Sequence, residues 1–256
     1  MEKENFVAKN SIVREIWGKS DTILLIFAGA SAEFALNKAV DWLYFTGKLP
    51  KDPLGRLFST VNYAREIVFA DRNSAINAIE RMNRIHSSVE NIRGKNIPAW
   101  AYRDVLFMLI DYSIRSFEIL ERPLKIAEKE EVFEVFSRLG EHMHLKNLPQ
   151  NYENYLKMRD SHLEQHLFYG DYTRDLYKQY RKNLGWLRYM LLLESQTMIV
   201  PKKVHNYLNL RRLSLISPFI KVFKISRRIR LDDLMKAMIL PPEYKTKIRS
   251  LDHQSS

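Results

Sequence analysis

Glycine and proline are scarce in this chain and fall between long segments with helical periodicity. Only 8 Gly and 9 Pro occur in 256 residues, and these are the residues that most often interrupt regular elements. Period-two alternation of apolar and polar residues is not sustained anywhere, and the hairpin dipeptides Asn-Gly and Asp-Gly do not occur. The chain is therefore predicted to be all-α, with a single large helical domain and a basic helical C-terminal tail.

Turn residues divide the chain into the expected helices. The first is expected to begin at Asp21-Thr22 and to end near Phe45, before Gly47 and Pro50. The helices that follow are expected at about 54–69, 73–91, 98–121, 126–140, 151–167 and 172–198, with a shorter one after Pro201.

The positive charge of the chain is concentrated near its C terminus. The net charge is +11, and residues 201–256 hold 13 Lys/Arg against 4 Asp/Glu, which leaves only +2 for residues 1–200. Such a segment can contact anionic lipid, nucleic acid or an acidic partner, and it can equally be a solvated basic surface. The predicted organisation is an N-terminal extension at 1–20, a helical domain at 21–215 and a basic tail at 216–256.

Several classes of protein are excluded or disfavoured by residues that the chain lacks. It has no Cys, which excludes disulfides, thiolate metal sites, cysteine nucleophiles and thiolate-ligated haem. It also lacks a Gly-rich phosphate loop and a Gly-x-Ser-x-Gly elbow. The best apolar run covers residues 23–32, whereas a membrane-spanning helix needs about 20 apolar residues. A cytoplasmic protein is therefore expected.

One apolar stripe of an expected helix contains a histidine. Ile79, Met82, His86 and Val89 follow one another at helical spacing. A histidine in such a stripe is expected to be largely buried. It can be a hydrogen-bonded core residue, or it can give one ring nitrogen to a metal ion.

The preceding expected helix carries an arginine and a threonine on one face. Arg56 and Thr60 are four residues apart, and Tyr63 continues the same face. An inward-pointing Arg is costly unless it is paired. Its partner is either an anionic group of a bound cofactor or a neighbouring carboxylate such as Asp41 or Asp52.

Two other patterns are of the kind that bind metal ions. His162 and His166 lie four residues apart on one expected helix face, a spacing that can hold a metal. Glu141 and His144 form the only Glu-x-x-His sequence, whereas a di-iron bundle needs two such motifs and two further Glu. Both patterns are more often ordinary polar surface than metal sites.

Three segments in fixed order resemble the MpaB/rubber-oxygenase family, which includes the latex-clearing proteins. They are Gly29-Ala-Ser-Ala-Glu-Phe-Ala35, Asp52-Pro-Leu-Gly-Arg-Leu-Phe-Ser-Thr60 and Arg84-Ile-His-Ser-Ser-Val89. The resemblance extends over about residues 20–215. It implies a helical protein that binds haem b and activates dioxygen.

The resemblance also assigns roles to individual residues. It places the proximal iron ligand at His86 and the distal Arg and Thr at Arg56 and Thr60. Asp41 lies near the position of a distal carboxylate base, and Arg84 flanks the ligand. Met82, on the same apolar stripe as His86, is the expected wall of the haem pocket. The chain departs from the rubber-oxygenase branch in three respects. Ser59 replaces a Lys, Asn83 replaces an Arg, and the Glu that serves as distal base has no clear equivalent apart from Asp41 upstream. Cleavage of rubber itself is therefore not implied.

The function predicted from the resemblance is that of a haem b-dependent oxygenase. Its partners would be dioxygen and an apolar, prenyl- or lipid-like small molecule, and the basic tail could hold it on the inner face of an anionic membrane. The alternative is a non-enzymatic helical adaptor. Such an adaptor would bind an anionic membrane surface or, with less support, nucleic acid through its basic C-terminal region.

Overall fold

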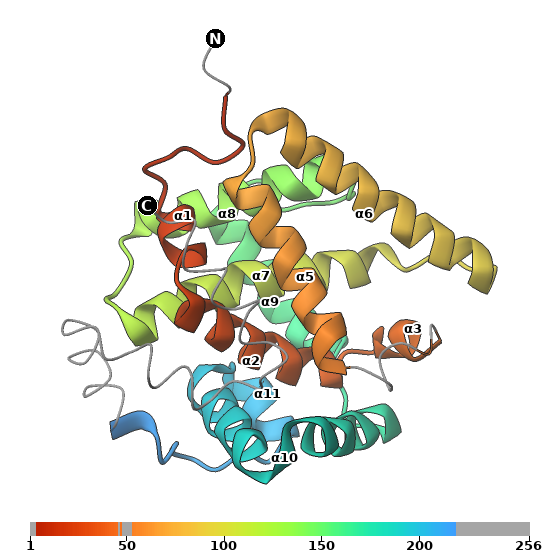
Figure 1. Cartoon of the computed structure of the whole chain (residues 1–256), viewed down its shortest axis with the longest axis vertical. Helices are drawn as coiled ribbons and strands as arrows, with labels where there is room; N and C mark the ends of the chain where they lie inside the picture. The colour runs from red at the N-terminus through yellow and green to blue at the C-terminus, as the bar shows by residue number, and fades with distance from the viewer. Residues whose placement is uncertain (1–3, 46, 48–52, 219–256) are drawn as a thin grey trace.

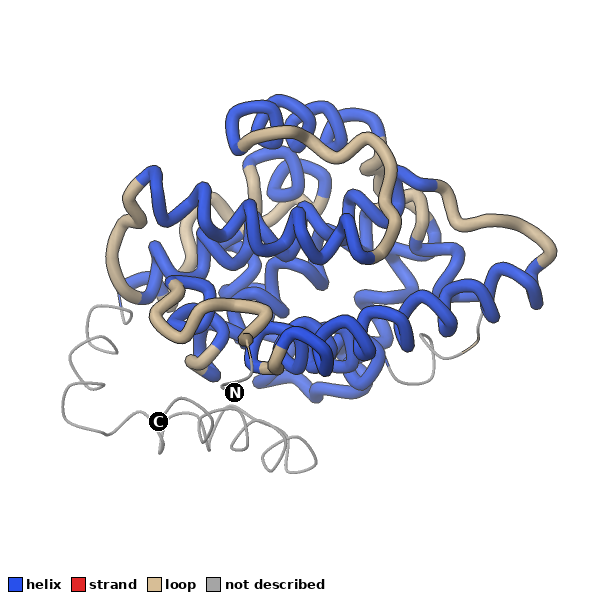
Figure 2. The backbone as a smooth tube through the Cα atoms, turned by 90° about the horizontal axis from the view of Figure 1, so that it is seen from above, coloured by secondary structure: helices blue, strands red, loops and turns tan. Residues whose placement is uncertain are grey.

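The computed structural model describes residues 4–45, 47 and 53–218, without the side chains of five residues in one helix (Pro53, Leu54, Arg56, Leu57 and Phe58). In this part of the chain the regular elements are all helices, joined by short loops (Figures 1 and 2), as predicted. They are α1 (Ile12–Trp17), α2 (Ser20–Leu36), α3 (Val40–Phe45), α5 (Pro53–Phe69), α6 (Arg72–Arg93), α7 (Ala99–Leu120), α8 (Ile126–His142), α9 (Tyr152–Gln165), α10 (Asp171–Ile199) and α11 (Lys202–Tyr207).

Helix α2 lies in the middle of the molecule and is covered on several sides. It packs against α7 and α10, and α1 and α5 also contact it. Its sequence is apolar around most of its circumference, and nearly all of its residues are buried. A helix of this composition is stable only where other helices surround it. Helix α2 is therefore the element on which the core is built.

The first expected helix is broken into two. It was predicted to run to Phe45, but α2 ends at Leu36 and α3 begins at Val40. Asn37 takes an extended conformation, and its side-chain oxygen accepts a hydrogen bond from the backbone N–H of Ala39 (2.8 Å). Asparagine competes for backbone groups in this way and favours helix ends. The break turns the chain at the end of α2.

The N-terminal segment belongs to the core. The sequence predicts an N-terminal extension at residues 1–20. In the structure, Phe6, Val7 and Trp17 are buried against the helical domain. The indole Nε1–H of Trp17 donates to Ser113 Oγ in α7 (3.0 Å). Most of the predicted basic tail, residues 219–256, lies outside the described residues.

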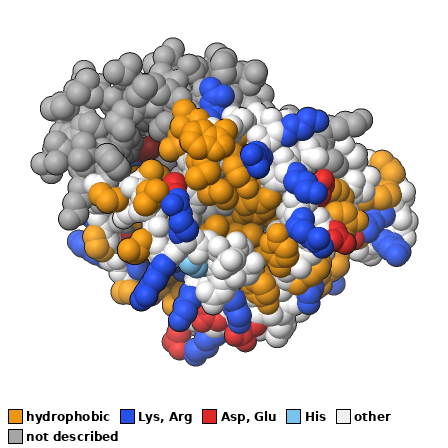
Figure 3. All heavy atoms as spheres, turned by 90° about the horizontal axis from the view of Figure 1, so that it is seen from below, with side chains coloured by type: hydrophobic (Ala, Val, Ile, Leu, Met, Phe, Trp, Pro, Cys, Tyr) orange, Lys and Arg blue, Asp and Glu red, His pale blue; other side chains and the backbone are white. Residues whose placement is uncertain are grey.

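Helix α10 contains a sharp irregularity at Gly185. The residue has φ 70° and ψ 173°, a conformation that only glycine adopts readily. Directly after it, Trp186 and Leu187 are exposed, Trp186 by 69%. The face of the molecule seen in Figure 3 shows hydrophobic side chains gathered together with Lys and Arg around them.

Substitution of Gly185 by Ala is expected to destabilise the fold. A Cβ atom would have free space there, so the cost arises from the backbone conformation alone, about 1–2 kcal/mol in the free energy of unfolding. Denaturant titration of Gly185→Ala beside Lys182→Ala measures it, since an exposed helical position is expected to change stability by less than about 0.5 kcal/mol. Equal stability of the two variants would contradict the expectation.

No helix among the described residues combines the length and the apolar content needed to cross a bilayer.

Candidate functional site

Helix α6 places the predicted ligand His86 on its partly covered face. The helix begins where the Asp71 side chain accepts a hydrogen bond from Ser74 N (3.1 Å) and ends at Gly94 with φ 66°. Along the stripe Ile79 is buried, whereas Met82 and His86 are half-buried. The stripe therefore leaves the core as α6 extends toward the edge of the molecule (Figure 1).

The imidazole of His86 faces the first turn of α7. Its ring lies edge-on to the ring of Tyr102, with 5.1 Å between the centroids. The Tyr102 hydroxyl donates to Glu90 on α6 (3.2 Å), and the same carboxylate accepts from the backbone N–H of Ile97 (2.8 Å). These contacts hold the end of α6 against the start of α7.

The predicted distal residues lie on α5, which pairs with α6 through a tight turn. Arg56 precedes Ala70 by 14 residues, and His86 follows Asp71 by 15. Because each residue of a helix adds the same rise, the backbones of Arg56 and His86 lie at similar distances along their helices from the turn. Thr60 is half-buried, and the Arg56 side chain is among those outside the description. In Figure 1 α5 and α6 diverge from this turn.

The remaining predicted pocket residues have other partners. Asp41 Oδ2 lies 2.7 Å from a guanidinium nitrogen of Arg93, the last residue of α6. That guanidinium also lies over the Trp42 ring, 4.0 Å from its centroid. Arg84 points to solvent, with 68% of its side chain exposed and Glu80 4.0 Å away. The structure thus places Thr60, Met82 and His86 on the paired helices, Asp41 in an ion pair and Arg84 on the surface.

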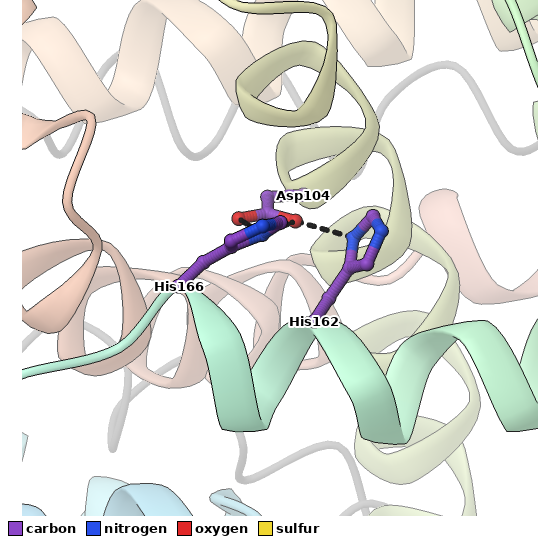
Figure 4. A group of neighbouring side chains, drawn as sticks. All are labelled: Asp104, His162 and His166. Carbon is purple, nitrogen blue, oxygen red and sulfur yellow. Dashed lines mark hydrogen bonds and ion pairs between the residues drawn. The ribbon is translucent and has the colours of Figure 1, made fainter.

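A second group of side chains converges between α7 and α9. Asp104 comes from the first turns of α7, and His162 and His166 come from the end of α9 (Figure 4). His166 Nδ1 lies 3.0 Å from Asp104 Oδ2, and His162 Nδ1 lies 2.5 Å from Asp104 Oδ1. One potential ligand atom from each residue lies within 4.8 Å of the others.

Neighbouring side chains fix the orientation of this Asp–His–His cluster. Asn37, the residue that ends α2, donates from Nδ2 to Asp104 Oδ2 (2.7 Å). The Phe107 ring stacks on His162 (centroids 5.0 Å apart), and the Trp100 ring packs on His166 (4.3 Å). The carboxylate and both imidazoles are therefore held by contacts outside the cluster.

The sequence predicted two of the three residues of this cluster. The spacing of His162 and His166 placed them on one helix face, and the structure confirms that placement. Asp104 carried no signal, because it lies 58 residues before His162 and belongs to an apolar segment. The Glu141–His144 pattern does not form one helix face, since α8 ends at His142 and His144 has φ 59°.

The Asp–His–His cluster and His86 lie on different sides of α7. Trp100 and Asp104 are four residues apart and face α9, whereas Tyr102, between them, faces His86 on α6. The two candidate sites are therefore separate, although both use the start of the same helix.

Comparison with protein-family models matches residues 18–224 to the family described as "ER-bound oxygenase mpaB/B'/Rubber oxygenase, catalytic domain". The match spans most of the chain, including the helices that carry His86 and the Asp–His–His cluster. Comparison with curated protein sequences gives no match.

Proposed function

This chain belongs to the mpaB/B' and rubber-oxygenase family, and we propose from that membership that it is a haem b-dependent oxygenase in which His86 would hold the iron. The oxygenase class follows from the family. The observation that supports haem binding by His86 is the position of its half-buried imidazole, on the face of α6 turned toward Tyr102.

The residues around His86 fit a haem in their chemistry. A helical histidine is the commonest proximal ligand, and a Cys-free chain cannot use a thiolate instead. Met82 lies one turn before His86 and Val89 one turn after it, and both are half-buried apolar side chains that could line a porphyrin. When bound, haem b supplies the iron centre at which dioxygen is activated.

The chain's own residues would position substrate and move protons. The Thr60 hydroxyl and the Arg56 guanidinium are assigned as donors on the distal side by the family resemblance. Asp41 is the carboxylate proposed to accept a proton. Arg93 holds it by a charged hydrogen bond of 2.7 Å, so one role of Arg93 would be to orient that base.

The substrate proposed is an apolar small molecule, prenyl- or lipid-like, taken from a membrane surface. Support for peripheral membrane contact comes from α10, where exposed Trp186 and Leu187 follow the exposed cations Arg181 and Lys182 closely in the sequence. Aromatic and basic side chains together favour the interface of an anionic bilayer. The proposed location is the cytoplasm, with the enzyme held at the inner face of the membrane.

The haem proposal is tested by an ultraviolet–visible spectrum of the full chain purified after haem supply. We expect a Soret band in the parent protein that is lost or shifted in His86→Ala, because the variant lacks the imidazole that would hold the iron. His144→Ala is the matched control, since His144 is an exposed histidine in a turn and its loss should leave the band unchanged.

A folded parent that stays colourless after haem is added would overturn the proposal. It would favour the helical adaptor, whose anionic-membrane binding is measured by co-sedimentation with vesicles containing phosphatidylserine. A Soret band of unchanged position and intensity in His86→Ala would assign the ligand to another residue.

A further inference from the structure

We propose that Asp104, His162 and His166 form a second metal site, which binds one divalent transition-metal ion. The proposal is independent of the haem site, because the cluster lies on the α9 side of α7, away from His86. Each residue would give one ligand atom, namely a carboxylate oxygen and an imidazole nitrogen from each histidine.

The spacing of Asp104 and His166 suits ligands of one ion, and that of His162 needs a small adjustment. Metal–ligand bonds of about 2.1 Å place neighbouring ligand atoms about 3.0 Å apart in octahedral and about 3.4 Å apart in tetrahedral geometry. His166 Nδ1 lies 3.0 and 3.1 Å from the two Asp104 oxygens. His162 Nδ1 lies 2.5 Å from Oδ1, so a side-chain rotation that opens this gap by less than about 1 Å would admit the ion.

His162 has a buried ring nitrogen aimed at this point. Only 8% of its side chain is exposed, and its Nδ1 makes no hydrogen bond of acceptable geometry to any of the described residues, despite the short approach to Asp104. A buried polar atom without a hydrogen bond is costly. A metal ion bound by Nδ1 and Oδ1 would replace this short contact with two metal–ligand bonds.

A bound cation would also give the buried Asp104 carboxylate a charged partner. Asp104 is almost fully buried (4% of its side chain exposed), and its partners among the described residues are Asn37, His162 and His166. In the same core, the Arg159 guanidinium pairs with the carboxylates of Glu33 and Asp111. Buried charges are normally paired or coordinated to a metal. At Asp104 a divalent ion would supply the positive charge that an Arg supplies at Glu33.

The donor set indicates which ions fit. Two imidazoles and one carboxylate suit Zn²⁺, Fe²⁺ and neighbouring ions of the first transition row better than Ca²⁺ or Mg²⁺, which prefer oxygen ligands. Three protein ligands leave at least one position for water or another small ligand. Asn37 and the rings of Trp100 and Phe107 contact the three side chains from outside and fix their orientation, as the neighbours of metal ligands commonly do.

The test is metal binding by the tag-free full chain after exposure to a chelator and without added haem. We expect isothermal titration with Zn²⁺ to show one site, and Co²⁺ to give visible d–d absorption bands from bound ion. His166→Gln and Asp104→Asn are expected to weaken Zn²⁺ binding at least about 100-fold. His205→Gln, a histidine on α11, and His86→Ala should bind as the parent does.

A stability readout keeps the test decisive if one variant folds poorly. Zn²⁺ at 100 times its dissociation constant for the parent should raise the unfolding temperature of the parent, because it binds the folded state. The same concentration should raise that of His166→Gln by less than about a fifth as much. His166 is the less buried histidine, so its substitution is the milder one. Failure of the folded parent to bind Zn²⁺ or Co²⁺, or parent-like binding by His166→Gln, would overturn the proposal.

Discussion

Substitution of Arg159 by Met is expected to lower the free energy of unfolding by about 3–5 kcal/mol. Arg159 enters the core from α9 with only 5% of its side chain exposed. Its guanidinium donates to both oxygens of Glu33 on α2 (2.5 and 2.6 Å) and to Asp111 on α7 (3.0 Å). Methionine would fill much of the volume but leave the buried Glu33 carboxylate without its cation and Asp111 with only Arg115 (2.7 Å).

The loss of stability in Arg159→Met arises from the buried carboxylate left behind, so a second substitution can test it. Glu33 is 2% exposed and also accepts a hydrogen bond from the buried Tyr112 hydroxyl (2.8 Å). Adding Glu33→Gln to Arg159→Met should therefore recover part of the loss, because it removes one uncompensated charge. Arg174→Met is the control. Its ion pair with Asp171 lies on the surface, and such pairs contribute less than about 1 kcal/mol.

Chemical denaturation at neutral pH measures these differences. A loss of less than 1 kcal/mol in Arg159→Met, equal to that of the surface control, would contradict the role assigned to the network.

The same network gives a direction for the pH dependence of stability. Burial acts to raise the pKa of Asp111, but the charges of Arg159 and Arg115 outweigh it and hold the pKa below its usual value. A carboxyl with a lowered folded-state pKa stabilises the fold above its unfolded pKa, about 3.9, and this stabilisation is lost as pH falls through the folded value. Asp111→Asn should therefore show a shallower loss of stability in acid.

Substitution of Gly29 by Ala is expected to cost about 3 kcal/mol in the free energy of unfolding. A Cβ atom at Gly29 would lie 2.3 and 2.4 Å from Cδ1 and Cε1 of Tyr112. Tyr112 is fully buried and its hydroxyl is bonded to Glu33, so its ring cannot move aside without disturbing the ion network. Glycine at this position allows α7 to approach α2 closely.

Gly140 provides a matched comparison for Gly29. A Cβ there would meet Leu106 Cδ2 at 2.8 Å and Leu148 Cδ1 at 3.1 Å. Both atoms are the ends of flexible side chains, so Gly140→Ala should cost clearly less than Gly29→Ala. Thermal unfolding of the two variants beside the parent decides this, and an equal or reversed order would show that Tyr112 can be displaced at little cost.

Local patterns in the sequence were sufficient for the helical class and for single helix faces. Gly94 and Pro98 separate α6 from α7 as expected, and the stripe through Met82 and His86 lies on the partly covered face of α6. Such features depend on residues three or four apart, which the geometry of one helix brings together wherever that helix packs. The pairing of His162 with His166 follows for the same reason.

The break at Asn37 shows where local reasoning was insufficient. Nothing in residues 21–45 requires a helix end at that point, but the Asn37 side chain bonds both to Ala39 N and to Asp104 on α7. The second bond exists only after α2 and α7 have packed together. Tertiary contacts thus override a continuous helical pattern.

The sequence by itself determined that this chain forms long helices, that His86 lies on a partly covered helix face and that His162 and His166 share one face. Only the tertiary structure decided that Asp104 meets those two histidines and that Arg159 joins Glu33 to Asp111. The physical reason is distance along the chain. These partners are 48 to 126 residues apart, so their contacts depend on how the helices pack and not on the periodicity of any one helix.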